Sequence, residues 1–499
     1  MGNTQSASTL ETCLTSAVGG NADLVAFPSK PLYQLIDVRP YNQDIKVHPV
    51  AVTYPETTDQ VSQIVKCATA EAGYAVQARG GGHSYGNYGL GGGQNSTIVV
   101  DLKNFQDFSM NENFEATIGG GTKLGDVTKR LLNSGNRAMA HGTCPDVGIG
   151  GHATMGGLGP TSRMWGTAMD HVIEYEVVLA NSTIVKASAT QYPEVFFALK
   201  GAGASFGIVT NFKVVTHPAP GQTVHYSYTF SARPFANLAQ RFKDWQTMIS
   251  DPNLSRKLAS QVTLTELGMI ISGTFFGSKP EFEALNITSI FPDSSTQNVT
   301  VFDDFLGTVA NWAEDLGVSL GGLSTPFYSK NLAFTKEDLI PGDTIDTFFQ
   351  YLDNVDKGTL IWFAIFDLEG GAINGKILAS PFCLYTLASF VQETDILQDI
   401  PSNATAYGHR DALLYLQTYG VGIPTLSSTT RSFITGMDDI VLNGSQGKSL
   451  GSYPGYVDLQ LPDAQQKYFG SNLPELERLK GILDPKDLFR NPQSIKPKI

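Results

Sequence analysis

The sequence has no excess of positive charge and no long apolar run. Lys and Arg number 34 against 47 Asp and Glu, so the formal net charge is −13. Such a charge keeps a protein in solution and is poorly suited to binding nucleic acid. No apolar stretch approaches the roughly 20 residues that span a bilayer. We therefore expect a soluble protein with no nucleic-acid partner and no membrane span.

Cysteine is scarce, and its spacing excludes two common uses. The four cysteines are Cys13, Cys67, Cys144 and Cys383, and no two of them form a C-x-x-C pair. A zinc ribbon or a thioredoxin-like redox site is therefore disfavoured. Each cysteine is by default a small buried hydrophobic residue. A disulfide between Cys13 and Cys67 would require an oxidising compartment, and the sequence leaves this pairing open.

Several catalytic signatures are also missing. The chain contains no G-x-x-x-x-G-K-[ST] loop, no H-E-x-x-H pair and no G-x-S-x-G elbow. A P-loop nucleotide hydrolase, a zinc protease and a serine hydrolase are therefore disfavoured. His141 and His152 are too far apart to share one helix face, so we expect no metal site. His152 and His171 are expected to act as structural hydrogen-bonding groups.

The N-terminal residues MGNTQSASTLETC lack the basic start and the apolar core of a secretory signal. We therefore expect a cytoplasmic protein, with secretion as the alternative if a leader has been removed. Gly2 and Ser6 fit the short pattern for N-myristoylation. The sequence leaves that modification open.

The chain is long enough for more than one domain. Its 499 residues exceed the usual size of a single hydrophobic core. An extended segment, a helical period over 58–72 and a second apolar segment form a βαβ-like unit. Residues 173–188 are predicted to form a hairpin. Prolines near residue 218 mark the first domain boundary, and alternating strands and amphipathic helices then continue to about residue 450.

Two glycine-rich loops carry the reactive side chains. RGGGHSYGNYGLGG (79–92) holds His83 and Tyr85, and HGTCPDVGIGGHATMGGLG (141–159) holds Cys144. Glycine runs cost backbone entropy unless the chain turns sharply or approaches another group closely. The backbone N–H groups of such loops suit a diphosphate. From the residues alone, we predict a cofactor site with a phosphate-containing ligand.

These loops, with YPGYVDLQL and FRNPQSI near the C-terminus, resemble those of the berberine bridge enzyme-like flavoproteins of the vanillyl-alcohol oxidase superfamily. The resemblance covers nearly the whole chain. It implies an α+β fold with two domains, an FAD-binding domain and a substrate-binding domain built on an antiparallel sheet. We assign residues 1–218 and 451–499 to the FAD-binding domain and residues 219–450 to the substrate-binding domain.

The resemblance also implies that FAD is held by two covalent bonds, one to His83 and one to Cys144. Val147 matches a position that controls the access of oxygen, where a valine is usual in oxidases. The other positions that match the family's flavin site are Arg79, Gly80, Gly81, Gly82, Ser84, Gly148, Gly151, His152, Gly157 and Ile208.

The expected catalytic residues follow from the same resemblance. Tyr456 in YPGYVD matches the family's base, which removes the hydroxyl proton while a hydride moves to flavin N5. Asp367 matches a carboxylate that partners this tyrosine in oligosaccharide oxidases. Tyr85 matches a position beside the flavin, and Tyr453 is expected to line the pocket. We therefore expect an oxidase that is re-oxidised by O2 and releases H2O2.

The expected substrate is a phenolic or polyketide-like secondary metabolite. Sugar hydroxyls need polar partners. Glucooligosaccharide oxidases place Glu, Trp, Gln and Gln where this chain has Thr263, Phe363, Ile365 and Ala412. Gln261 argues the other way, because it matches a glutamine of the chitooligosaccharide branch. Oxidation of gluco-, xylo- or chitooligosaccharides at C1 is thus the alternative.

A catalytically idle flavin-binding protein is disfavoured because Tyr456, Asp367 and Val147 are all present. The sequence leaves open whether the reaction is simple oxidation or an oxidative cyclisation or coupling. We expect the protein to act as a monomer.

Overall fold

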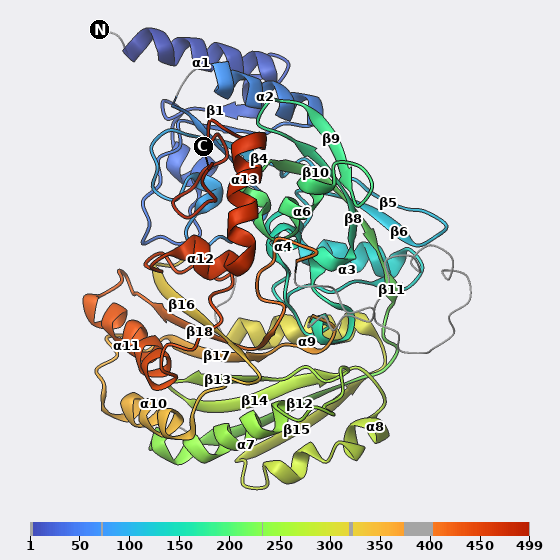
Figure 1. Ribbon diagram of the computed structural model, residues 1–499, viewed down its shortest axis with the longest axis vertical. Helices are drawn as coiled ribbons and strands as arrows, with labels where there is room; N and C mark the ends of the chain where they lie inside the picture. The colour runs from blue at the N-terminus through green and yellow to red at the C-terminus, as the bar shows by residue number, and fades with distance from the viewer. Residues whose placement is uncertain (1–2, 71–72, 232, 319–322, 374–402, 499) are drawn as a thin grey trace.

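The computed structural model describes residues 3–70, 73–231, 233–318, 323–373 and 403–498 (Figure 1). Gly2 and Cys383 therefore lie outside the described residues. No helix in these ranges combines the length and the hydropathy that crossing a bilayer requires.

The N-terminal part begins with a small sheet in the order β1-β2-β4-β3. Strands β2, β4 and β3 run parallel, so the connection from β2 to β3 needs a crossover, which helix α2 supplies. This is the predicted βαβ-like unit. Helix α1 lies against α2, and a disulfide joins Cys13 to Cys67. The bounds are α1 (Asn3–Ala17), β1 (Val25–Ala26), β2 (Ala51–Thr53), α2 (Thr58–Ala70), β3 (Ala75–Arg79) and β4 (Thr97–Asp101).

A second, antiparallel sheet has the order β5-β6-β10-β8-β9. Strands β8 and β9 form the hairpin predicted over 173–188. Buried side chains of α3, α4, α6 and the C-terminal helix α13 share one apolar core with this sheet. The bounds are β5 (Phe108–Met110), β6 (Glu115–Gly119), α3 (Leu124–Asn133), α4 (Ile149–Met155), β8 (Val172–Val178), β9 (Ile184–Ser188), α6 (Pro193–Ala202), β10 (Ile208–Val215) and α13 (Leu473–Leu483).

The third sheet has seven strands in the order β15-β12-β14-β13-β17-β18-β16, all antiparallel. Its bounds are β12 (Thr223–Ser231), β13 (Gln261–Thr265), β14 (Gly268–Phe275), β15 (Thr296–Phe302), β16 (Phe327–Thr335), β17 (Trp362–Leu368) and β18 (Ala412–Val421). Helices α7 (Ala239–Ile249), α10 (Gly342–Asn354) and α11 (Ser428–Gly444) cover one face (Figure 1).

Strand alternation decides which residues face the helices. On β17, Trp362, Ala364 and Phe366 join the core under α7, α10 and α11. Ile365 and Asp367 therefore point to the opposite face, which looks toward the N-terminal part (Figure 1).

The C-terminal segment returns to the N-terminal part, where α13 lies among the early elements (Figure 1). The predicted α+β fold, with an antiparallel substrate sheet beside an FAD-binding part, is confirmed. The division at residues 218 and 450 stays our proposal. The remaining elements are β7 (Arg137–Ala138), α5 (Ser162–Trp165), β11 (His217–Pro218), α8 (Lys279–Ala284), α9 (Phe305–Val318) and α12 (Ala464–Phe469).

Candidate active site

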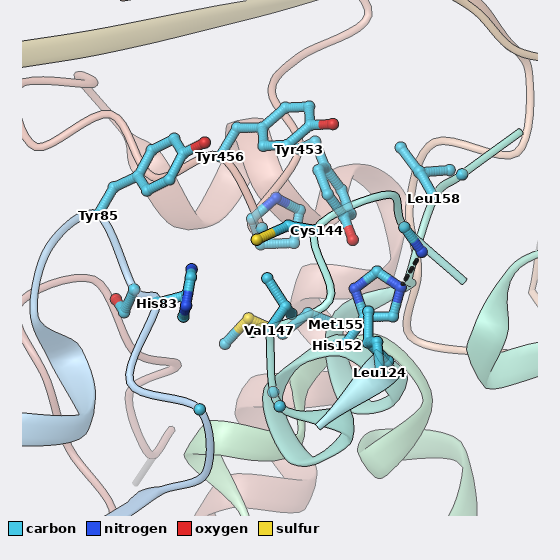
Figure 2. Close-up of a pocket in the computed structure, with 18 of the residues that line it drawn as sticks. His83, Tyr85, Leu124, Cys144, Val147, His152, Met155, Leu158, Tyr453 and Tyr456 are labelled. Carbon is cyan, nitrogen blue, oxygen red and sulfur yellow. Dashed lines mark hydrogen bonds between the residues drawn. The ribbon is translucent and has the colours of Figure 1, made fainter. Parts of the chain in front are cut away.

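A cavity of about 450 Å³ lies between the two glycine-rich loops and the open face of the seven-stranded sheet. Figure 2 shows His83, Cys144, Tyr85 and Tyr456 gathered around this space. Predicted site residues from segments far apart in the sequence thus share one cavity. Those that line it are Arg79, Gly80, Gly81, Gly82, His83, Ser84, Tyr85, Cys144, Val147, Gly148, Gly151, His152, Gln261, Thr263, Ile365, Asp367, Tyr453 and Tyr456.

The two loops touch through their glycines. A Cβ atom on Gly81 would lie 2.3 Å from the backbone nitrogen of Gly148, and one on Gly148 would lie 2.1 Å from the nitrogen of Gly81. Any side chain would therefore push the loops apart. A Cβ on Gly151 would meet nothing within 4 Å. The loops thus form a tight junction beside an open space, which is a suitable cradle for a diphosphate and a flat ring.

His83 and Cys144 are both half-buried at this cavity. Burial lowers the pKa of the His83 imidazole, against the attraction of Asp146. Burial raises the pKa of the Cys144 thiol, and Cys144 forms no disulfide. The cavity therefore holds a neutral imidazole and a free thiol, both able to form covalent bonds to a cofactor.

Arg79 and His152 have structural partners. The Arg79 guanidinium donates to Asp101 at 2.8 Å and to the carbonyl of Asp37 at 2.7 Å. This arginine links β3 to β4, and its charge is paired with the Asp101 carboxylate. His152 Nε2 accepts from the Gly142 N–H at 3.0 Å (Figure 2). Burial lowers the pKa of His152 to about 3, so it is a neutral acceptor that fixes the Cys144 loop.

Three predicted site residues do not line the cavity. Gly157 has a φ of +89° and donates its N–H to the hydroxyl of Tyr453 at 2.8 Å. Ile208 belongs to the apolar core beneath the first sheet. Phe363 is 6% exposed and packs on Tyr419 with ring centroids 6.2 Å apart.

The predicted catalytic residues meet at one side of the cavity. The rings of Tyr85 and Tyr456 are nearly parallel, with centroids 6.3 Å apart and an interplanar angle of 15°. The Tyr85 hydroxyl accepts from Gln417 Nε2 at 2.8 Å. Burial raises the pKa of Asp367 to about 7. Burial, followed by the charge of Asp367, raises the pKa of Tyr456. Among the described residues, no hydrogen bond joins Asp367 to the Tyr456 hydroxyl.

The register of the sheet sets the floor of the cavity. Asp367 lies opposite Gln261, and Ile365 lies between Thr263 and Gln417 on the neighbouring strands. This places Gln261 and Asp367 side by side on one cross-strand row, and Thr263, Ile365 and Gln417 on the next row. Tyr453 also lines the cavity.

Some lining residues were not predicted. The Tyr41 ring lies against that of His83 at an angle of 31°, and Gln417 donates a hydrogen bond to the Tyr85 hydroxyl. Glu369 also lines the cavity, two residues after Asp367. Glu369 is 5% exposed, and its Oε2 atom is buried without a hydrogen-bond partner. Its spacing of two residues from Asp367 was the one sequence signal for it. Across the described ranges, no group of three His, Cys, Asp or Glu side chains forms a metal site.

Family models match both ends of the chain. One described as an FAD binding domain matches residues 49–188, and one described as berberine and berberine like matches residues 452–496. Among curated relatives, the FAD-linked oxidoreductase sorD of Penicillium rubens is 38% identical over 99% of both chains. Chitooligosaccharide oxidase of Gibberella zeae is 30% identical over 92% of this chain and 89% of its own.

Solved structures show the same fold. Xylooligosaccharide oxidase from Myceliophthora thermophila, in complex with xylobiose, superposes with a TM-score of 0.83 at 26% identity, covering 98% of this chain and 100% of that one. Glucooligosaccharide oxidase from Acremonium strictum, with a 6-S-cysteinyl, 8α-N1-histidyl FAD, gives 0.83 at 27% identity, covering 98% and 99%.

Proposed function

The chain belongs to the berberine bridge enzyme-like FAD-linked oxidoreductases, and we propose from this that it is a bicovalent FAD oxidase of a hydroxyl-bearing, phenolic or polyketide-like metabolite. FAD is its cofactor, and its activity is that of an oxidoreductase. The observation that carries the finer proposal is that His83, Cys144, Tyr456 and Asp367 line one cavity.

We assign the flavin tethers to His83 and Cys144. The imidazole and the thiol stand on separate glycine loops, and the flavin of the glucooligosaccharide oxidase carries one histidyl and one cysteinyl bond. Backbone N–H groups of both loops would hold the diphosphate. Bound FAD supplies a two-electron acceptor that O2 re-oxidises with release of H2O2. Val147 lines the same cavity, which supports its role in oxygen access.

Tyr456 and Asp367 would remove the proton from the substrate hydroxyl. Because burial raises the pKa of Tyr456, its hydroxyl stays protonated at neutral pH, and it cannot serve as the base without a partner. Asp367, with a pKa of about 7, suits proton transfer near neutrality. Tyr456 would take the substrate proton as it releases its own, and Asp367, which in the described part of the chain acts on Tyr456 through its charge and not through a direct hydrogen bond, would be the final acceptor. Tyr85, fixed by Gln417, completes the wall beside the reacting carbon.

The floor of the cavity supports the substrate class. Thr263 and Ile365 form a small, largely apolar surface, which leaves sugar hydroxyls without partners there. The relative sorD bears the name of an FAD-linked oxidoreductase and is more similar in sequence than the chitooligosaccharide oxidase. Of these two observations, the apolar floor is the one that favours a less polar molecule.

Oligosaccharide C1 oxidation is the second candidate function. Gln261 lines the cavity beside Asp367, and Gln417 and Glu369 add polar groups. The xylooligosaccharide oxidase that shares the fold was solved with xylobiose. An enzyme that oxidises cello-, xylo- or chitooligosaccharides would need these polar groups to hydrogen-bond the hydroxyls at the reducing end of the sugar.

Peroxide release in air separates the two candidates. Purified protein would be assayed with cello-, xylo- and chitooligosaccharides and with a set of phenolic and polyketide alcohols, using Tyr456→Phe as the matched inactive control. Rapid peroxide release with a sugar would replace the preferred substrate class. Release only with the aromatic or polyketide set, absent in the control, would support it.

For location, the Cys13–Cys67 bond supports the secreted alternative over the cytoplasmic expectation, because cytosolic thiols are kept reduced. Thiol alkylation of native cell extract and culture medium tests this. An oxidised pair in the medium supports secretion, and a reduced pair confined to the cytosol restores the cytoplasm. We also propose a monomer, which light scattering of the purified protein checks.

A further inference from the structure

The imidazole of His83 lies against the ring of Tyr41. Among the described residues, no hydrogen bond holds its nitrogens, and its ring contact is with Tyr41, whose centroid lies 4.6 Å away at an angle of 31°. Tyr41 lines the same cavity. An unbonded imidazole is free to rotate about its side-chain torsions, and confining those torsions costs free energy. Among the described residues, the Tyr41 ring is therefore the ring placed to limit the orientation of His83.

Tyr41 is itself fixed by a buried asparagine from the His83 loop. Asn87 is 2% exposed, and its Oδ1 accepts from the backbone N–H groups of Tyr41 and Asn42 at 3.1 Å each. Its Nδ2 donates to the carbonyl of Asn42 at 2.8 Å. The segment that carries Tyr41 is thus bonded to the loop that carries His83, so the two rings keep a constant relation.

A second asparagine joins this pair to the substrate sheet. Asn42 is 1% exposed, and its Nδ2 donates to the carbonyls of Tyr85 and Phe327 at 3.0 Å and 3.1 Å. Its Oδ1 accepts from the Phe327 N–H at 3.3 Å. Phe327 packs edge-on against Tyr41, with centroids 5.6 Å apart. The position of Tyr41 is therefore set from both sides of the cavity.

We propose that Tyr41 is a positioning residue for the covalent attachment of flavin to His83. This inference rests on the proposed function, because it takes His83 as a tether. In the attachment, a bond forms between an imidazole nitrogen and the flavin 8α carbon. One N–H bond and one C–H bond break, and the two electrons and two protons pass to O2 as H2O2. Such a step needs the nitrogen aimed at one carbon, which the Tyr41 ring secures.

The test maps flavin onto two peptides of the same molecule. Tyr41→Leu removes the ring, Tyr41→Met fills the space flexibly, and Tyr41→Phe keeps the ring without the hydroxyl. Each purified variant is digested, and mass spectrometry measures the flavin-bearing fraction of the His83 and Cys144 peptides over time after expression. The Cys144 peptide is the internal control, and the Met variant serves if the Leu variant does not fold.

We expect Tyr41→Phe to resemble the native protein at both peptides. Tyr41→Leu and Tyr41→Met should slow attachment at His83 at least about tenfold, because misorientation of a reacting group costs rate, while Cys144 stays linked. Attachment at His83 at the native rate in the Leu or Met variant would overturn the inference. So would a Phe variant as slow as Leu. A native protein with no flavin on His83 would overturn the tether assignment itself.

Discussion

Burial raises the pKa of both Tyr456 and Asp367, so that Tyr456 stays protonated at neutral pH while Asp367 titrates near pH 7, and this determines how they act. A tyrosine with a raised pKa stays protonated at neutral pH, so it can remove a proton from the substrate only if another group accepts its own proton. A carboxyl group that titrates near neutrality can take a proton at physiological pH. The chemistry therefore belongs to the pair, with the tyrosine facing the substrate and the aspartate receiving the proton.

Tyr456→Phe tests the first member of the pair. The change keeps the ring, including its contact with Tyr85, and removes only the hydroxyl. We expect the rate of anaerobic flavin reduction to fall by about 10²- to 10⁴-fold, the usual contribution of a general base. Covalent flavin content should be unchanged, because His83 and Cys144 are intact. A variant that reduces its flavin at the native rate would remove Tyr456 from the mechanism.

Asp367→Asn tests the second member through pH. Asp367 must be ionised to receive a proton, so kcat/KM of the native enzyme should rise as pH increases through about 7. Below that pH the carboxyl is already protonated and activity is lost. The Asn variant should be slow and should lose this inflection. An unchanged inflection in the variant would assign it to another group, with Glu369 the nearest candidate, since Asp367 raises its pKa after burial does.

At the scale of elements, the site depends on the junction between the His83 loop and the start of α4. Gly148 caps α4 and touches Gly81 through backbone atoms on both sides. Backbone atoms cannot move aside as a flexible side chain can. Gly151, one turn into the same helix, points into open space. Alanine substitutions at Gly148 and Gly151 therefore test the junction, one at the loop contact and one on the same helix away from it.

Gly148→Ala should lower the free energy of unfolding by about 1–3 kcal/mol, the usual cost of overpacking. It should also reduce the covalent flavin fraction, because the loops would separate. Gly151→Ala should destabilise the protein less, since its Cβ would meet no protein atom within 4 Å and alanine favours a helix. Denaturant unfolding of both variants gives the comparison. Equal destabilisation by the two changes would contradict the proposed junction.

At the scale of the whole molecule, the cavity exists only because the N-terminal part and the seven-stranded sheet are held together. Arg410, just before β18, donates to both oxygens of Asp170, just before β8, at 2.8 Å each. Their side chains are 1% and 4% exposed. A buried ion pair between the two parts fixes their relative position more than it adds stability.

Asp170→Asn should destabilise the protein by about 3–5 kcal/mol, because it removes the buried carboxylate charge that pairs with the Arg410 guanidinium. Thermal unfolding measures this. Lys279→Gln is the control, because its ion pair with Glu283 is exposed and such pairs add little. If both variants unfold at the native temperature, the Asp170–Arg410 pair does not hold the two parts together.

The sequence by itself determined the local features of this protein. The βαβ-like unit, the hairpin over 173–188 and the two glycine loops depend on periodicity, turn residues and backbone freedom, which neighbouring residues set. Together with the C-terminal YPGYVD motif, these loops were specific enough to indicate the family, FAD and the pair His83 and Cys144.

Only the tertiary structure decided which side chains reach the cavity. Phe363 has the same parity on β17 as Ile365 and Asp367, yet it lies opposite Tyr419 and is covered by it. Tyr41 and Gln417 are far from the motifs in sequence and enter through loop contacts and strand register. Strand register and long-range packing depend on contacts between segments that are distant in sequence, and local sequence patterns do not predict those contacts.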